Sequence, residues 1–199
     1  MLKLNKKEAT SMKLMIILGS SRQGRKGEVV ARWVRKHAAE RFEVDFVDLQ
    51  TLNLPFFNEP LSPFSMKREG REYTHPEGRT WAERVAKTEG VMLVTPEYNH
   101  GYPGVLKNTL DWVGPEWVDK PVAFVSYSSQ ITGGVRAVEQ LRQVVVELGL
   151  VQVANAIHIP RIAEAFDGDE PTHPGATVAL GKMFDELERL QRAMASQKK

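Results

Sequence analysis

The sequence contains no cysteine. Without thiols, the chain can form no disulfide, no thiolate nucleophile, no iron–sulfur ligation and no cysteine-based zinc site. If the protein carries out redox chemistry, a bound cofactor must therefore supply the reactive group.

Long apolar runs and a large excess of charge are also lacking. No run approaches the roughly 20 apolar residues that a membrane-spanning helix needs. The first eleven residues, MLKLNKKEATS, are basic and polar and lack the apolar centre of a signal peptide. Lys plus Arg number 27 and Asp plus Glu number 25, so the formal charge is only +2. We expect a cytoplasmic protein without a membrane partner, because no membrane span or signal peptide is indicated. We also expect no nucleic-acid partner, because nucleic-acid binding favours one dominant basic face.

The 199 residues suit one folded domain. We expect residues 1–12 to be a disordered N-terminal extension and residues 13–199 to form a single domain. Within it, apolar runs predict five buried strands, over 13–18, 43–48, 90–95, 121–126 and 151–157. Helical periodicity predicts helices from residue 27, over 79–87, from 103, over 134–148 and over about 176–195, whereas residues 51–78 are predicted to be irregular.

Alternation of apolar strands with helices predicts an α/β fold with a three-layer, doubly wound, five-stranded parallel sheet. In such sheets, ligands bind at the carboxyl ends of the strands. The loops after the first, third and fourth strands are therefore the candidate site.

The loop after the first strand, residues 19–27, reads GSSRQGRKG and leads into a helix. A helix N-terminus offers free N–H groups and partial positive charge, and Ser20, Arg22 and Arg25 add further donors. This pattern favours a phosphate site, and a terminal monophosphate in particular, because neither a dinucleotide nor a P-loop signature is present. The alternative is a solvated basic turn. Asp48, at the end of the second strand, is expected to be a turn residue.

The loop after the third strand, TPEYNHGYPG, is polar, aromatic and rich in proline. A stiff turn of this kind can present backbone groups to a flat ring, and Tyr98 and Asn99 can donate hydrogen bonds. The alternative is a stiff strand–helix connection without a ligand.

Three segments, GSSRQGRKGE, TPEYN with GYPGVLKNTLDW, and SYSSQITGGVRA, resemble the NAD(P)H-dependent FMN reductases. This flavodoxin-like family includes azoreductase-, quinone reductase- and chromate reductase-like flavoproteins. The resemblance runs from about Met12 to the last helix. It implies the strand order 2-1-3-4-5, bound FMN, NADPH or NADH as co-substrate, and a homodimer or homotetramer.

Matched positions imply the contacts with FMN. The phosphate would be held by four positions of the first loop, Ser20, Arg22, Arg25 and the backbone at Gly27. The isoalloxazine ring would be lined by four positions after the third strand, Pro96, Glu97, Tyr98 and Asn99. Its pyrimidine edge would be approached by two positions after the fourth strand, Tyr127 and Ser128. We expect no catalytic side chain and no metal site.

The resemblance implies that hydride passes from NADPH to flavin, and that a flavin, quinone, azo compound or metal oxyanion is then reduced in a ping-pong cycle. The alternatives are a flavodoxin-like electron carrier and a non-catalytic FMN-binding module. Four large apolar side chains are expected at a subunit interface, with the monomer core as the alternative: Phe56, Phe57, Trp112 and Trp117. His37 and His158 are expected to be structural.

Overall fold

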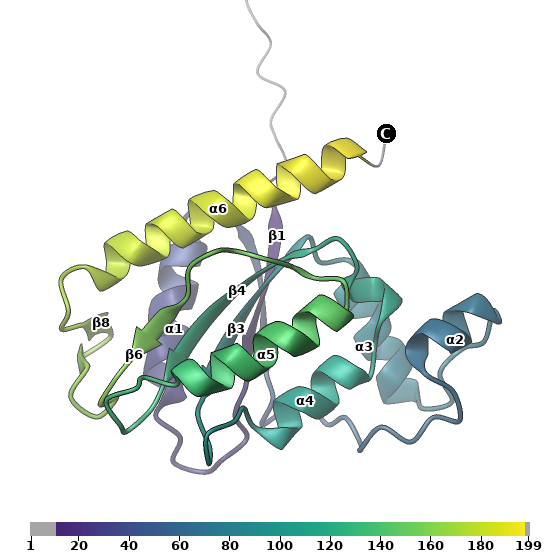
Figure 1. Ribbon diagram of the computed structural model, residues 1–199, viewed down its shortest axis with the longest axis horizontal. Coiled ribbons are helices and arrows are strands. Elements are labelled where there is room, and N and C mark those ends of the chain that lie inside the picture. Colours follow the sequence, from purple (N-terminus) through teal and green to yellow (C-terminus); the bar gives the residue numbers. More distant parts are fainter. Residues whose placement is uncertain (1–10, 198–199) are drawn as a thin grey trace, which may run out of the picture.

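The computed structural model describes residues 11–197, and a parallel sheet forms its centre (Figure 1). Its main strands are β1 (Lys13–Leu18), β2 (Glu43–Asp48), β3 (Gly90–Pro96), β4 (Pro121–Tyr127) and β5 (Val151–Gln152). They lie in the order β2-β1-β3-β4-β5, and every pair is parallel. The predicted strand order is therefore confirmed.

Helices cover both faces of the sheet (Figure 1). One face carries α1 (Gly27–Ala38) and α6 (Ala176–Gln197), and the other carries α3 (Pro76–Ala86), α4 (Gly104–Asp111) and α5 (Val135–Glu147). Alternate residues of β1 enter the two layers: Leu14, Ile16 and Leu18 join the core of α1 and α6, while Met15 and Ile17 join the other. The three-layer, doubly wound architecture is thus confirmed.

The fifth strand is interrupted, so the prediction of one strand over 151–157 is wrong. β5 pairs with the start of β4, and a separate strand β6 (Ile157–Ile159) pairs with its end. Between them, the N–H of Ala154 donates to the carboxylate of Glu186 on α6 at 3.1 Å. This bond holds the backbone away from the β4 ladder.

The segment predicted to be irregular contains helix α2 (Pro63–Arg68). Ser62 caps it by accepting a hydrogen bond from the N–H of Ser65, and Pro63 occupies the first turn, where proline is favoured. A serine followed by a proline is a helix-start signal, and here it marks the start of α2.

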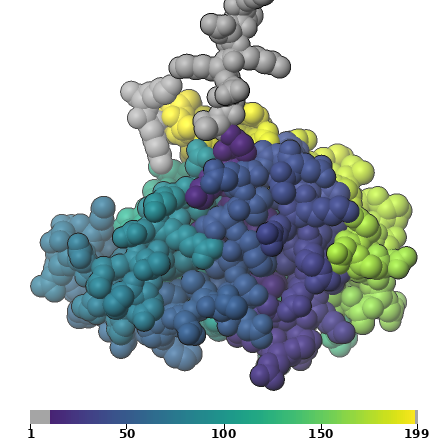
Figure 2. Space-filling model, turned by 180° about the vertical axis from the view of Figure 1, so that it is seen from behind, coloured from purple at the N-terminus to yellow at the C-terminus, as the bar shows by residue number. Residues whose placement is uncertain are grey.

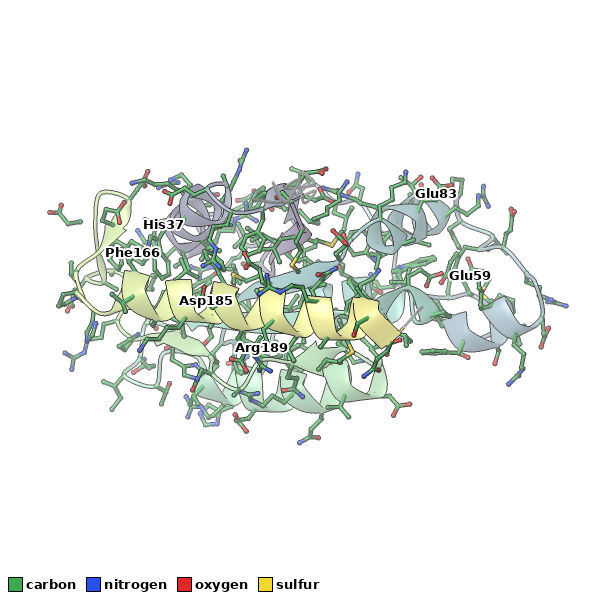
Figure 3. All side chains as sticks on the ribbon, turned by 90° about the horizontal axis from the view of Figure 1, so that it is seen from above. His37, Glu59, Glu83, Phe166, Asp185 and Arg189 are labelled. Carbon is green, nitrogen blue, oxygen red and sulfur yellow. The ribbon has the colours of Figure 1, made fainter. Side chains whose placement is uncertain are left out.

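Helix α3 begins three residues before the predicted position, at Pro76. The buried carboxylate of Glu59 accepts hydrogen bonds from the N–H of Thr74 at 2.7 Å and of His75 at 3.3 Å. This contact ties the long segment after β2 to the start of α3, at the end of the molecule that carries α2 (Figure 3).

Residues 166–174, predicted to be an acidic surface loop, include a hairpin of β7 (Phe166–Asp167) and β8 (Glu170–Pro171). It packs against α1, where Arg32 pairs with Asp169 at 3.0 Å and Phe166 meets the ring of Trp33 edge to face. From behind, the yellow-green segment around this hairpin lies beside the purple surface of the N-terminal part (Figure 2). Figure 3 shows His37 and Phe166 at the same end of the molecule.

Trp112 and Trp117 are fully buried, so the expectation that they lie at a subunit interface is wrong. Their indole N–H groups donate to the carbonyls of Pro55 at 2.7 Å and Leu110 at 3.2 Å. They complete the core beneath α3 and α4, as the alternative proposed. Phe57 is half-buried against the Trp112 ring, and Phe56 is 84% exposed.

Most of the expected N-terminal extension, residues 1–10, lies outside the described part of the chain. The last residue assigned to it, Met12, is buried in the core, and its carbonyl accepts a hydrogen bond from the N–H of Glu43. None of the helices within residues 11–197 has the length and apolar character needed to cross a membrane.

Candidate functional site

Three loops meet at the carboxyl edge of the sheet: the first loop (19–26), the second loop (97–103) and the third loop (128–134). The hydroxyls of Ser20 and Tyr98 are 2.7 Å apart, which joins the first loop to the second. The N–H of Glu97 donates to the carbonyl of Tyr127 at 3.2 Å, which joins the second loop to the end of β4. The three segments predicted to form one site are therefore neighbours.

The first loop presents hydrogen-bond donors. Ser20 is fully buried, and its hydroxyl accepts from the N–H of Arg22 at 3.4 Å. The guanidinium of Arg22 is exposed and has no ion-pair partner within residues 11–197. Lys26, at the N-cap of α1, makes no side-chain capping bond, so the first N–H groups of the helix stay available.

The Arg25 side chain lies differently from its predicted position on a phosphate. It is buried, and its two terminal nitrogens donate to the two carboxylate oxygens of Asp48 at 2.7 and 2.5 Å. One of them also donates to the carbonyl of Ser20, and Nε donates to Glu28. Burial is the largest single influence and opposes ionisation of Asp48, but the hydrogen bonds from Arg25 and from the N–H of Gln50, together with the charge of Arg25, outweigh it and lower the pKa of that carboxyl. Sequence reasoning missed this role of Asp48.

The second loop is a tight turn at the end of β3. Tyr98 and Gly101 exchange backbone hydrogen bonds of 2.8 and 3.0 Å, and Asn99 and His100 have φ angles of 50° and 68°. Positive φ at both central residues defines a type I′ turn, which asparagine tolerates well. The turn is rigid and exposes Asn99, as a ring-facing loop requires, and Pro96 is the buried last residue of β3.

Glu97 points to α5. Its side chain is 5% exposed and accepts hydrogen bonds from the backbone N–H of Arg136 at 3.1 Å and from its Nε at 2.7 Å. The carboxylate thus holds the N-terminus of α5, where negative charge is stabilising. The GGVRA segment contains this partner, but the sequence gives no sign that it pairs with Glu97.

The third loop is anchored by side-chain hydrogen bonds within the protein. The Ser128 hydroxyl donates to the carbonyl of Gln130 at 3.1 Å and accepts from the N–H of Gln130 at 3.2 Å. The buried Ser126 hydroxyl donates to the carbonyl of Gly133 at 2.8 Å. Because a hydroxyl has one proton, its 2.7 Å contact with Nδ1 of His158 makes that ring nitrogen the donor. His158 is therefore a structural residue, as expected.

The His158 bond predicts a pH dependence of stability. Burial, followed by the charge of Arg142, lowers the pKa of His158, so the unfolded chain binds a proton at higher pH than the folded one. The stabilisation is present above the unfolded pKa of about 6.5 and is lost as the pH falls through the folded pKa. We expect His158→Asn to reduce the loss of unfolding free energy between pH 7.5 and pH 5, measured by urea unfolding. The exposed control His100→Asn should keep the wild-type loss, and an unchanged slope in His158→Asn would contradict the assignment.

Tyr127 ends β4 beneath the start of α1. It is 4% exposed, and a Cβ atom added to Gly27 would lie 1.9 Å from its hydroxyl oxygen. Burial raises the pKa of Tyr127, and the nearby Ser20 opposes this shift only weakly. The hydroxyl makes no hydrogen bond of acceptable geometry with the described residues. An uncapped helix end and an unpartnered buried donor fit a phosphate group. The hydroxyl thus lies beside the start of α1.

Comparison with known proteins decides the family. The profile described as NADPH-dependent FMN reductase matches residues 12–164, which include all three loops. The chain belongs to this family. As a member, the protein is an oxidoreductase with FMN as cofactor and NAD(P)H as co-substrate.

Relatives of this FMN reductase come from fungi and bacteria. The NAD(P)H-dependent FMN reductase LOT6 of Saccharomyces cerevisiae is 33% identical over 159 residues, which are 75% of this chain and 82% of that protein. A quinone reductase of Escherichia coli is 33% identical over 141 residues, 69% of this chain and 71% of that protein. The solved structure of FerB, a flavoenzyme NAD(P)H:(acceptor) oxidoreductase from Paracoccus denitrificans, has a TM-score of 0.72 at 22% identity and covers 91% of this chain and 98% of that one. This last likeness supports the fold.

Proposed function

We propose that the protein oxidises NADPH through bound FMN and reduces a quinone, azo compound, free flavin or metal oxyanion in a ping-pong cycle. The observation that carries the proposal is the convergence of three features at one sheet edge. These are the uncapped start of α1, the Arg22 guanidinium, which has no ion-pair partner within residues 11–197, and the tight turn of the second loop. FMN supplies the redox chemistry by accepting hydride and passing on electrons. The names of the quinone reductase and of an NADPH azoreductase from Bacillus support this choice of acceptors.

At the phosphate end, we propose that Ser20, Arg22 and the N–H groups at Gly27 hold the phosphate. Arg22 is the one arginine of the first loop whose donors are free within the described part of the chain. We do not assign Arg25 to the phosphate, because its donors are already hydrogen-bonded to Asp48, Glu28 and the carbonyl of Ser20.

At the ring end, we propose that Pro96, Tyr98 and Asn99 line the isoalloxazine, while Glu97 fixes the start of α5 beside them. Ser128 and the third loop are assigned to the pyrimidine edge, where backbone donors would stabilise negative charge on the reduced ring. We assign no side chain as nucleophile or base.

An anaerobic titration tests the function. We expect the purified protein to be yellow, to bleach with NADPH, and to regain its colour when menadione or an azo dye is added. A colourless protein that FMN cannot reconstitute would overturn the proposal. A stable one-electron semiquinone without NADPH oxidation would favour the electron carrier, and flavin binding without any turnover would favour the non-catalytic module.

Removing the Arg22 guanidinium is expected to weaken FMN binding. Hydrogen bonds to charged groups contribute about 1.5–3 kcal/mol, so the Kd of Arg22→Ala for FMN should rise by roughly 10- to 150-fold, measured by fluorescence quenching. Arg35→Ala removes the same charge from an exposed position farther along α1 and serves as the control. Equal affinities for FMN in Arg22→Ala and wild type would exclude Arg22 from the phosphate site.

We propose a homodimer or a homotetramer, located in the cytoplasm, in which residues 13–199 form one flavodoxin-like domain. Phe56 supports a self-association surface, since a large apolar side chain that is 84% exposed on a loop fixed to α4 favours burial against another surface. Sedimentation of the purified protein tests the oligomer, and a monomer at micromolar concentration would exclude it.

A further inference from the structure

We infer that Asp48 is a positioning residue for FMN, which acts through Arg25 to hold the first loop in its phosphate-binding form. The inference rests on the proposed function, because it assumes that FMN binds at this loop. It assigns a role to a residue of β2 that lies 23 positions from Arg25 in the sequence.

The geometry of the pair is that of a clamp. The side chains of Arg25 and Asp48 are 3% and 22% exposed, and they meet through two parallel hydrogen bonds. A planar guanidinium fits a carboxylate in this bidentate way, which fixes its orientation as well as its position.

The Arg25 guanidinium also contacts the start of the first loop. The Nη1 atom that meets Asp48 also donates to the carbonyl of Ser20, five residues earlier. The Arg25 side chain therefore closes residues 20–25 into a ring. The closed stretch of chain includes Arg22 and Gly24, and Gly24 has a φ of 65°. Fixing the Ser20 carbonyl also fixes the plane of its peptide bond with Ser21, and with it the direction of the next N–H.

Asp48 itself is well anchored. Its Oδ1 accepts from the N–H of Gln50 at 2.8 Å, and its carbonyl accepts from the hydroxyl of Thr51. It stands opposite Leu18 in the parallel ladder of β1 and β2, directly before the first loop leaves the sheet. A rigid carboxylate at this place can orient Arg25, and through it the loop.

Replacing Asp48 by asparagine separates three explanations by its effects on FMN affinity, riboflavin affinity and thermal stability. If the clamp orients the loop, Asp48→Asn weakens FMN binding, by about tenfold, while binding of riboflavin, which has no phosphate, changes much less. If Arg25 is instead a phosphate ligand held back by Asp48, the same change frees it and strengthens FMN binding. If the pair only stabilises the fold, the thermal midpoint falls and the ratio of FMN to riboflavin affinity stays at the wild-type value.

Arg25→Lys provides a second test that keeps the charge. Lysine cannot make the bidentate contact, so the clamp predicts a loss of FMN affinity similar to that of Asp48→Asn, whereas a simple charge contact would be largely retained. Asp45→Asn is the matched control, because Asp45 is also on β2 and makes a bidentate pair, with Arg84 of α3. It should leave both flavin affinities unchanged.

These measurements keep the two proposals apart. Wild-type protein that binds neither flavin would overturn the proposed function, and the clamp with it. Wild-type protein that binds FMN, with an affinity that neither Asp48→Asn nor Arg25→Lys weakens, would overturn the clamp alone.

Discussion

Replacing Trp112 by alanine is expected to lower the free energy of unfolding by about 3–5 kcal/mol, the range for large aromatic residues removed from a core. Trp112 is fully buried, and its ring meets those of Phe57, Tyr73 and His75 at centroid distances of 5.3, 6.2 and 5.5 Å. It also fills the space left by Gly78, where a Cβ atom would lie 2.5 Å from the indole. Urea unfolding of the purified variant measures the loss.

Val178→Ala is the control for this prediction. Val178 on α6 is also apolar but 62% exposed, so its removal should change the free energy of unfolding by no more than about 0.5 kcal/mol. If Trp112→Ala kept the wild-type stability but sedimented as a smaller assembly, Trp112 would belong to a subunit interface and its assignment to the core would be wrong.

Gly27→Ala is expected to disrupt the start of α1 and FMN binding together. The new methyl group would lie 1.9 Å from the hydroxyl oxygen of Tyr127 and 2.4 Å from its Cζ, in a core where neither group has free space. Overpacking of this kind typically costs about 1–3 kcal/mol. Because the helix end must shift to relieve it, its N–H groups leave the phosphate position, and the Kd for FMN should rise at least about tenfold. Thermal unfolding and fluorescence titration measure the two effects.

Gly181→Ala is the matched control, since a Cβ atom at Gly181 meets nothing within 4 Å on helix α6. This change should raise stability by about 0.5–1 kcal/mol and leave FMN affinity unchanged. Wild-type stability and FMN affinity in Gly27→Ala would show that the Tyr127 ring can turn aside, and would contradict its tight packing under α1.

The central strands β1, β3 and β4 could be predicted because burial on both faces makes each of them an apolar run, whereas the order of the strands followed from the family resemblance. The interruption between β5 and β6 could not, because it depends on a bond from Ala154 to Glu186, a residue on another element. The burial of Trp112 and Trp117 was missed for a similar reason: a large aromatic residue suits a core and an interface equally, and only the packed tertiary structure separates the two.

The three loops of the site could also be located from sequence, because parallel strands place their carboxyl ends at one edge. The partners of their charged residues could not. Arg25 and Asp48 meet because β1 and β2 pair in a register that aligns Leu18 with Asp48, and Glu97 meets Arg136 across 39 residues. Periodicity and motifs say which residue types are present, but not which opposite charges become neighbours after folding.

The pairing of Glu97 with Arg136 bears on the reduction potential of the proposed site. Two-electron reduction adds negative charge to a flavin, so an unpaired carboxylate beside the ring would make reduction harder. Here that carboxylate is matched by a guanidinium and by the positive end of α5. An acidic residue can therefore fix the shape of the second loop without placing an uncompensated negative charge beside the flavin. The reduction potential would then be set mainly by the first loop and by the donors at the pyrimidine edge.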